Sequence, residues 1–305
     1  MEANKIENGL THLKGKEYIS ESTIDFFRDI IRAQHSIKSQ LDKTEAISFA
    51  TEDEIKRKME EGEPLLACDD IPLKESCLKE LFSKICGIME RQGNSDAEGI
   101  QRLIDAEGSG SIDLITLIKK LFNHDSEYFH TLSDEIEVGE DVLIFVALHL
   151  AKPFFETAAA GIKDKVVDKL WLRHYCPVCG SVAQMSRLEK DVGKKILCCQ
   201  LCGSEWRYMR IKCPFCCSEE QKKLKFLEEE KGPYRIDFCE KCKRYIKTLD
   251  ERKGGYDRGE IIPEVEDIAT IYLDMLAEEE GYERSWFFPP SAEQIKAGED
   301  NRTLH

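Results

Sequence analysis

The chain has 305 residues, 41% of them hydrophobic and 34% charged, a composition typical of a soluble protein with two or three domains. Its formal net charge of −15 argues against a general nucleic-acid-binding protein. The first residues lack a basic segment followed by an apolar run, and the longest apolar run, residues 142–148, is far shorter than the roughly 18–20 residues that span a bilayer. We therefore expect a cytoplasmic protein without membrane insertion.

Amphipathic helices are predicted for most of residues 1–170. Residues 1–17 are polar, and we expect them to be loosely held. A helical pattern begins at Ile19, with Ser20 or Ser22 as its cap. The same spacing of apolar residues predicts further helices, and Pro153 could interrupt the long one among them; they cover residues 74–91, 97–105, 112–122, 141–160 and 162–171.

The sequence contains no familiar catalytic signature. HExxH, GxSxG, P-loop and GxGxxG patterns do not occur in it, which removes the commonest metalloprotease, hydrolase and nucleotide sites. We therefore expect no catalytic residues and no organic cofactor site. The protein is predicted not to be an enzyme, and a redox role remains open only for metal bound by cysteine.

Eight cysteines after residue 170 form four Cys-x-x-Cys pairs. Two such turns that face each other supply four thiolates to one tetrahedral ion. Nineteen residues separate the first two pairs and twenty-two the last two, close to the roughly 15–20 of known metal ribbons. We predict two metal sites in chain order, the first made by Cys176, Cys179, Cys199 and Cys202 and the second by Cys213, Cys216, Cys239 and Cys242.

The cysteine pattern leaves several alternatives open. A cross-braced arrangement, in which the first pair joins the third and the second joins the fourth, also fits the spacing. Disulfides are disfavoured because structural disulfides belong mainly to exported proteins. Zinc and a single iron both suit four sulfur ligands. A closed four-cysteine site has no open position for a substrate water, which disfavours hydrolytic chemistry.

The residue after each cysteine pair affects how the backbone turns. Gly180 and Gly203 follow the first two pairs and allow a turn with positive φ. Cys217 occupies the equivalent position after Cys216, so the second site departs from the pattern at this point. Its ligand set is therefore less secure than that of the first site.

Short β-favouring runs connect the cysteine pairs, and we predict strands at 194–197, 206–211, 223–226, 234–238 and 245–249. The expected fold is α+β and multidomain: a helical N-terminal domain (1–170), two tandem rubredoxin-like or zinc-ribbon metal modules (171–212 and 213–254), then a C-terminal helix and an aromatic tail (255–305). The helix runs from Pro263 to Gly281, and the tail includes residues 286–290. Because such small modules bury little apolar surface, we expect metal to supply about 10–16 kcal/mol of their folding free energy.

Charge is unevenly distributed along the chain. Residues 171–250 contain seventeen lysines and arginines against eleven aspartates and glutamates, a formal +6 that leaves −21 on the rest. Basic side chains could simply offset the negative tetrathiolate sites. They could also form a docking face for RNA or for an acidic protein segment.

The cysteine pairs and their flanks, together with a C-terminal segment, carry a resemblance to a known family. The motifs are YCPVCGS (175–181), CxxCxxEW (199–206), RxKC (210–213), CxxCxxYxK (239–247), EDIA (266–269), LD (273–274) and EGY (280–282). Over roughly residues 171–282 the chain resembles the formate dehydrogenase accessory protein FdhE family. In the N-terminal half the likeness is limited to helical character and the PLL segment (64–66).

The resemblance implies a cytoplasmic maturation factor that is needed for active formate dehydrogenase and binds its molybdenum- or tungsten-containing catalytic subunit. It also implies rubredoxin-like iron at the eight paired cysteines, with zinc as the alternative. Cys198 and Cys217 depart from the family pattern and leave another choice of ligands open. Two other functions compete: a rubredoxin-like electron-transfer protein and a zinc-ribbon RNA-binding protein.

Overall fold

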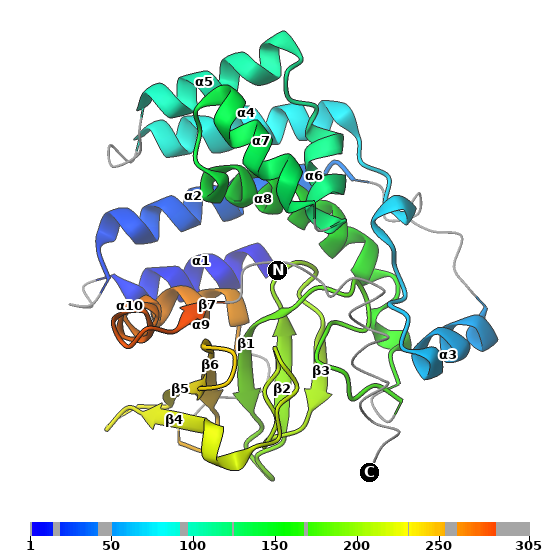
Figure 1. Ribbon diagram of the computed structural model, residues 1–305, viewed down its shortest axis with the longest axis vertical. Coiled ribbons are helices and arrows are strands. Elements are labelled where there is room, and N and C mark those ends of the chain that lie inside the picture. The colour runs from blue at the N-terminus through cyan, green and yellow to red at the C-terminus, as the bar shows by residue number, and fades with distance from the viewer. Residues whose placement is uncertain are drawn as a thin grey trace.

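In the computed structural model, a helical part stacks on a mixed β-sheet, with the C-terminal helices between them (Figure 1). The structure describes residues 2–14, 19–41, 51–91, 97–123, 125–167, 170–230, 232–253 and 261–284. The predicted aromatic tail lies outside these residues. The architecture agrees with the predicted order of a helical region, a cysteine-bearing β region and a C-terminal helical region.

Eight helices form the described N-terminal region. Their bounds are α1 Glu2–Leu13, α2 Glu21–Lys38, α3 Glu52–Glu61, α4 Glu75–Arg91, α5 Ala97–Ser109, α6 Leu114–Phe122, α7 Ser126–Ile136 and α8 Glu140–Ala160. The hydroxyl oxygen of Ser20 caps α2 by accepting a hydrogen bond from the amide of Thr23 (3.0 Å). Of the two predicted caps, Ser20 is therefore the one that the structure uses.

Two local predictions were wrong. Residues 1–17 were expected to be loosely held, but α1 forms and buries Ile6 and Leu10 against Val265 of the C-terminal region. Residues 162–171 were expected to be helical, but of those that the structure describes only the short turn Lys163–Lys165 is. The indole of Trp171 donates to the carbonyl of Tyr175 (2.8 Å), and both side chains are buried. In both cases tertiary packing outweighed local sequence preference.

Helix α8 is the central helix of the N-terminal region. It continues through Pro153 without interruption. Among the described residues it alone is long and apolar enough to cross a membrane, but 72% of its apolar window is buried inside the protein. That burial is typical of a core helix.

The sheet consists of two similar halves. The first ribbon contains β1 Ala183–Leu188, β2 Lys195–Cys199 and β3 Glu205–Tyr208, and the second contains β4 Leu224–Glu228, β5 Tyr234–Cys239 and β6 Arg244–Asp250. Each half is antiparallel, and a parallel pairing of β1 with β6 joins them in the order β3-β2-β1-β6-β5-β4. A short strand, β7 Glu283–Arg284, pairs with β6. All five predicted strands are present, but β1 and the two-residue β7 were missed.

The helical region and the first ribbon share one hydrophobic core. Trp171, Tyr175 and Trp206 belong to the same buried cluster as the apolar side chains of α4 to α8. The helical region and the first ribbon are therefore packed directly against each other.

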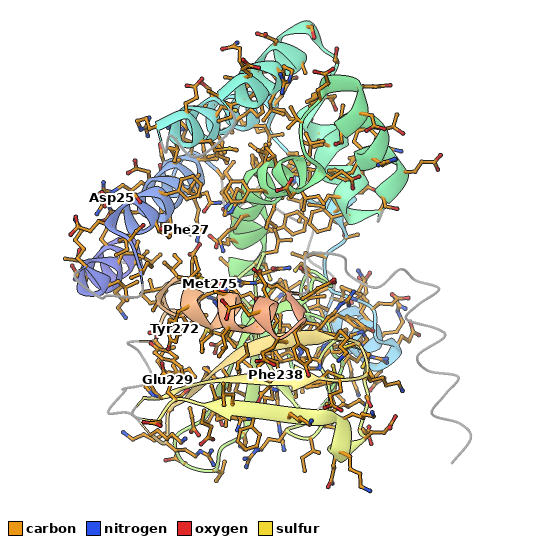
Figure 2. All side chains as sticks on the ribbon, turned by 60° about the vertical axis from the view of Figure 1, so that its left-hand side comes forward. Asp25, Phe27, Glu229, Phe238, Tyr272 and Met275 are labelled. Carbon is orange, nitrogen blue, oxygen red and sulfur yellow. The ribbon has the colours of Figure 1, made fainter. Side chains whose placement is uncertain are left out.

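The second ribbon has a separate, smaller core under the C-terminal helices. In place of the single helix predicted there, two short helices form, α9 Pro263–Ala269 and α10 Ile271–Glu279. They are separated at Thr270, whose hydroxyl donates to the carbonyl of Glu266 (2.7 Å). Figure 2 shows α10 beside the sheet, where Tyr272 donates to the carboxylate of Glu229. The second ribbon thus packs mainly against a thin helical layer.

Candidate metal centres

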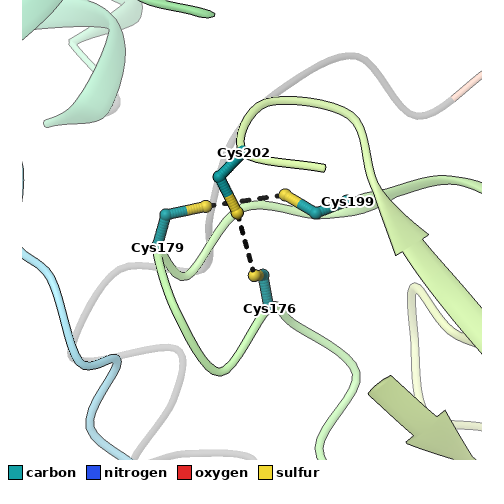
Figure 3. Close-up of side chains that lie close together, drawn as sticks. All are labelled: Cys176, Cys179, Cys199 and Cys202. Carbon is teal, nitrogen blue, oxygen red and sulfur yellow. Dashed lines mark hydrogen bonds between the residues drawn. The ribbon is translucent and has the colours of Figure 1, made fainter. Parts of the chain in front are cut away.

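The first cluster contains Cys176, Cys179, Cys199 and Cys202, all buried (Figure 3). Its sulfurs lie within 4.8 Å of one another, with 3.6 Å between Cys176 and Cys202 and 3.5 Å between Cys179 and Cys199. A disulfide would need about 2.05 Å. Zinc bound at about 2.3 Å to each sulfur predicts tetrahedral edges of about 3.8 Å. The donor set therefore fits a metal ion and not two disulfides.

The second cluster contains Cys213, Cys216, Cys239 and Cys242, and its geometry is nearly the same. The sulfur of Cys213 lies 3.7 Å from that of Cys242, and the sulfur of Cys216 lies 3.6 Å from that of Cys239. Both clusters combine neighbouring pairs in chain order, so the structure does not have the cross-braced arrangement. Each cluster could hold one metal ion.

Every cysteine pair lies on a tight turn. In the first pair the amide of Val178 donates to the sulfur of Cys176 (3.4 Å), and in the third the amide of Phe215 donates to the sulfur of Cys213 (3.4 Å). The residue after each pair has positive φ: 75° at Gly180, 66° at Gly203, 57° at Cys217 and 56° at Lys243. The missing glycine at Cys217 therefore does not prevent the turn, although a side chain is strained in that conformation.

The protonation of the thiols depends on a bound cation. Burial raises the pKa of the Cys176 and Cys179 thiols well above the ordinary value. Burial also opposes ionisation of Cys199, but hydrogen bonds from neighbouring thiols lower its pKa well below the ordinary value. Without metal, burial therefore favours the neutral form of the Cys176 and Cys179 thiols. A divalent or trivalent cation would supply the charge that stabilises four thiolates together.

Three contacts tie the first cluster to the helical region. The backbone amides of Leu65 and Leu66, which follow α3, donate to the carbonyls of Pro177 (2.9 Å) and Val178 (2.8 Å) in the first turn. The hydroxyl of Tyr175 donates to the carbonyl of Gly62 (2.8 Å). The PLL segment of the N-terminal half therefore supports the first cysteine turn directly.

Lys152 connects α8 to the other turn of the first cluster. Its ammonium group donates to the carbonyl of Gln200 (3.2 Å) and lies 3.4 Å from the carboxylates of both Glu156 and Glu264. Burial would lower the pKa of Lys152, but the two carboxylates raise it, so the side chain stays charged. Sequence patterns gave no sign of this residue, since a lysine in an apolar helix has no distinctive spacing.

Cys198 and Cys217 lie outside both four-sulfur clusters. Cys198 is buried, and its sulfur lies 3.6 Å from the carboxylate of Glu205. Cys217 lies 3.2 Å from Nδ1 of His174, a residue that precedes the first cluster by only two positions. The geometry thus favours the eight predicted cysteines over either alternative.

Several known proteins are similar in sequence to this chain. The chain is 30% identical over 244 residues to "Protein FdhE" of Salmonella arizonae, which covers 77% of this chain and 72% of that one. The chain belongs to the FdhE family. Models of the FdhE central and C-terminal domains match residues 175–210 and 211–289, which include all eight clustered cysteines. This FdhE homologue is thus a formate dehydrogenase accessory protein with two four-cysteine clusters.

Other FdhE relatives match along most of the chain. A "Protein FdhE homolog" of Aquifex aeolicus is 28% identical over 279 residues, 90% of each chain. The crystal structure of the FdhE protein from Pseudomonas aeruginosa aligns with a TM-score of 0.58 over 93% of each chain at 20% identity. The likeness to that structure shows a shared fold that includes the N-terminal helices.

The FdhE-like motifs outside the cysteines meet in one buried network. The ammonium group of Lys247 lies 2.6 Å from the carboxylate of Asp274 and 2.8 Å from that of Asp267. The hydroxyl of Tyr245 donates to Asp274 (2.7 Å), and Arg284 pairs with both carboxylates. Burial opposes ionisation of Asp267, but Arg284 and Lys247 lower its pKa. The network joins β6 of the second ribbon to α9 and α10, a role that sequence alone did not indicate.

Proposed function

We propose that this protein is a cytoplasmic maturation factor that binds the catalytic subunit of formate dehydrogenase, and that its eight paired cysteines ligate two metal ions. Family membership across 72% of the Salmonella arizonae relative carries the first part of the proposal. The two sulfur clusters, each with edges of 3.5–3.7 Å, support the second.

The clusters suit holding a partner better than hydrolysing a substrate. Four sulfur ligands complete the tetrahedral coordination of the ion and leave no position for a substrate water. Iron is the ion we expect and zinc is the alternative, since both accept four thiolates. The bound ion would supply folding free energy to each ribbon and, if it is iron, one-electron chemistry.

Co-purification with the catalytic subunit tests the proposed partner. Wild-type protein, prepared without oxygen, should retain the subunit on an affinity column, and Cys242→Ser should lose it. Cys68→Ser is the matched control, because Cys68 is also half-buried but lies outside both clusters. Failure of the wild-type protein to retain the subunit would contradict the proposal.

Electron transfer is a second candidate, favoured by one observation. Cys216 and Cys242 are only partly buried, which brings the second cluster near the surface. A redox-active protein should contain iron, show the visible absorption of ferric thiolates, and bleach on reduction. A colourless protein with two zinc ions per chain would exclude electron transfer by these clusters.

A further inference from the structure

A groove of about 470 Å³ lies beside the second cluster. Strands β4 to β6 form one wall, and the segment from β3 to the Cys213 turn forms the other. The hydroxyl of Tyr208 holds that segment by donating to the carbonyl of Cys213 (3.1 Å). Residues from both ribbons line it, among them Lys195, Arg210, Ile211, Phe226, Arg235 and Arg244.

The groove is strongly basic although the protein is acidic. Six of its lining residues are lysine or arginine and one, Asp237, is acidic. Four of the six basic residues already have acidic partners: Lys195 and Arg235 pair with Asp237 (3.0 Å each), Lys212 pairs with Glu219 and Lys225 pairs with Glu240. Arg210 and Arg244 are exposed and have no ion-pair partner among the residues that the structure describes. Positive charge is therefore available for an anionic ligand.

Arg235 carries a donor that nothing in the described structure satisfies. Only 9% of this residue is exposed, and its Nε is buried without a hydrogen-bond acceptor. Its guanidinium group lies over the ring of Phe226, 4.9 Å from the centroid. Because the Nε atom is enclosed, Arg235 contributes to the groove through its positive charge, which Asp237 partly offsets, and not through this donor.

Apolar side chains flank the positive charges. Ile211 is 55% exposed on one wall and Phe226 is 58% exposed on the other. Phe226 belongs to β4, the strand at the open edge of the sheet, which pairs only with β5 among the described strands. An edge strand offers backbone hydrogen bonds to an extended segment.

We propose that this groove binds a short acidic segment of the catalytic subunit of formate dehydrogenase, in which carboxylates alternate with apolar side chains. The inference rests on the proposed function and names the part of the partner that is recognised. The groove volume is within the roughly 300–1,000 Å³ of small-ligand sites, so it accommodates a few side chains and not a folded domain. The open edge of β4 can hydrogen-bond to an extended backbone, which favours a peptide over RNA.

Fluorescent peptides that tile the catalytic subunit test this site on the full-length protein. We expect the peptides that bind to contain aspartate or glutamate beside apolar residues. Their affinity should fall at least about tenfold in an Arg210→Glu, Arg244→Glu double variant and with added salt. Arg207→Glu is the matched control, because Arg207 is exposed on β3 but does not line the groove. Circular dichroism checks that each variant is folded.

A second pair of variants tests the apolar part of the groove. Phe226→Ala should weaken peptide binding severalfold, whereas Val192→Ala, at a side chain that is 65% exposed elsewhere, should leave it unchanged. If no acidic peptide binds the wild-type protein, or a poly-uridine RNA binds in preference, the groove proposal is overturned.

The intact catalytic subunit separates this proposal from the proposed function. Equal capture of the subunit by the wild-type protein and by the double variant would overturn the proposed role of the groove but would leave the proposed maturation role in place. Capture by neither protein would overturn the maturation role itself. Capture by the wild-type protein alone, with normal folding of the double variant, would support both.

Discussion

The two ribbons have the same order of cysteine turns and strands but different surroundings. All four cysteines of the first cluster are buried, and the first ribbon shares its core with α4 to α8. In the second cluster Cys216 and Cys242 are partly exposed, and β4 is mostly exposed. The same structural unit therefore anchors the fold where it is buried and presents a surface where it is not.

The two ribbons also differ at the residue that follows each cysteine pair. The first ribbon places glycine at both positive-φ positions, whereas the second places Cys217 and Lys243 there. A residue with a side chain costs about 1–2 kcal/mol in that conformation. The second ribbon is therefore built with more backbone strain and should depend more on its metal.

Substitution of one cysteine ligand in each cluster should have the largest effects on folding. These effects should also differ most between the two ribbons. Metal coupling of about 10–16 kcal/mol per site is comparable to the whole stability of a domain. We expect Cys199→Ser to unfold the shared core and the helices with it. We expect Cys242→Ser to unfold only the second ribbon. Far-UV circular dichroism with limited proteolysis distinguishes these outcomes, and equal loss of helix in both variants would contradict the comparison.

Lys247→Met tests how the second ribbon is attached to α9 and α10. Removing this buried ammonium leaves Arg284 as the one cationic partner of Asp267 and Asp274 among the described residues, which should cost about 3–5 kcal/mol in urea denaturation. Lys56→Met is the control, since Lys56 and Glu60 form an exposed ion pair worth less than about 1 kcal/mol. A similar cost in both variants would show that the network contributes little.

Sequence reasoning predicted the units of the fold better than their connections. The cysteine spacing predicted which four sulfurs lie together, and apolar spacing predicted most helices. Strand β1 was missed because residues 183–188 contain no β-branched or aromatic side chain. The similarity of the two ribbons could have revealed it, because β4 occupies the equivalent place after its own first turn.

The contacts between distant segments could not be read from periodicity. Lys152 pairs with Glu264 and Lys247 pairs with Asp274, and both of these partners lie far along the chain. The groove also depends on the parallel pairing of β1 with β6, which brings Lys195 near the second ribbon. Ligation of metal by the eight cysteines remains a prediction for experiment.

Acid should lower the stability of the core that α8 shares with the first ribbon. Burial, with a contribution from Lys152, lowers the pKa of His149 in α8 to about 3. Below about pH 6.5 the unfolded chain binds a proton that the folded chain does not, so stability is full above this pH and is lost as pH falls. From pH 6.5 to 5 the loss should reach about 2 kcal/mol. His149→Gln should reduce the dependence of the free energy of unfolding on pH between pH 6.5 and 5. An unchanged slope would contradict the assignment of this dependence to His149.

The smallest effects should appear at the cysteine turns. Gly203→Ala should destabilise the first ribbon by about 1–2 kcal/mol through backbone strain alone, since no atom beyond its neighbours in the chain lies within 4 Å of the added methyl. Gly108→Ala is the matched control, with equally open space but in α5, where alanine should stabilise by up to about 1 kcal/mol. In the second ribbon, Lys243→Gly should relieve strain, and thermal denaturation of the three variants compares the turns directly.

Metal analysis with X-ray absorption on protein prepared without oxygen tests the central claim most directly. The account predicts two ions per wild-type chain, each surrounded by four sulfurs at about 2.3 Å. It predicts one such ion in Cys242→Ser, with the helical region intact. Fewer than two ions in the wild-type chain, or nitrogen and oxygen ligands in place of sulfur, would contradict it.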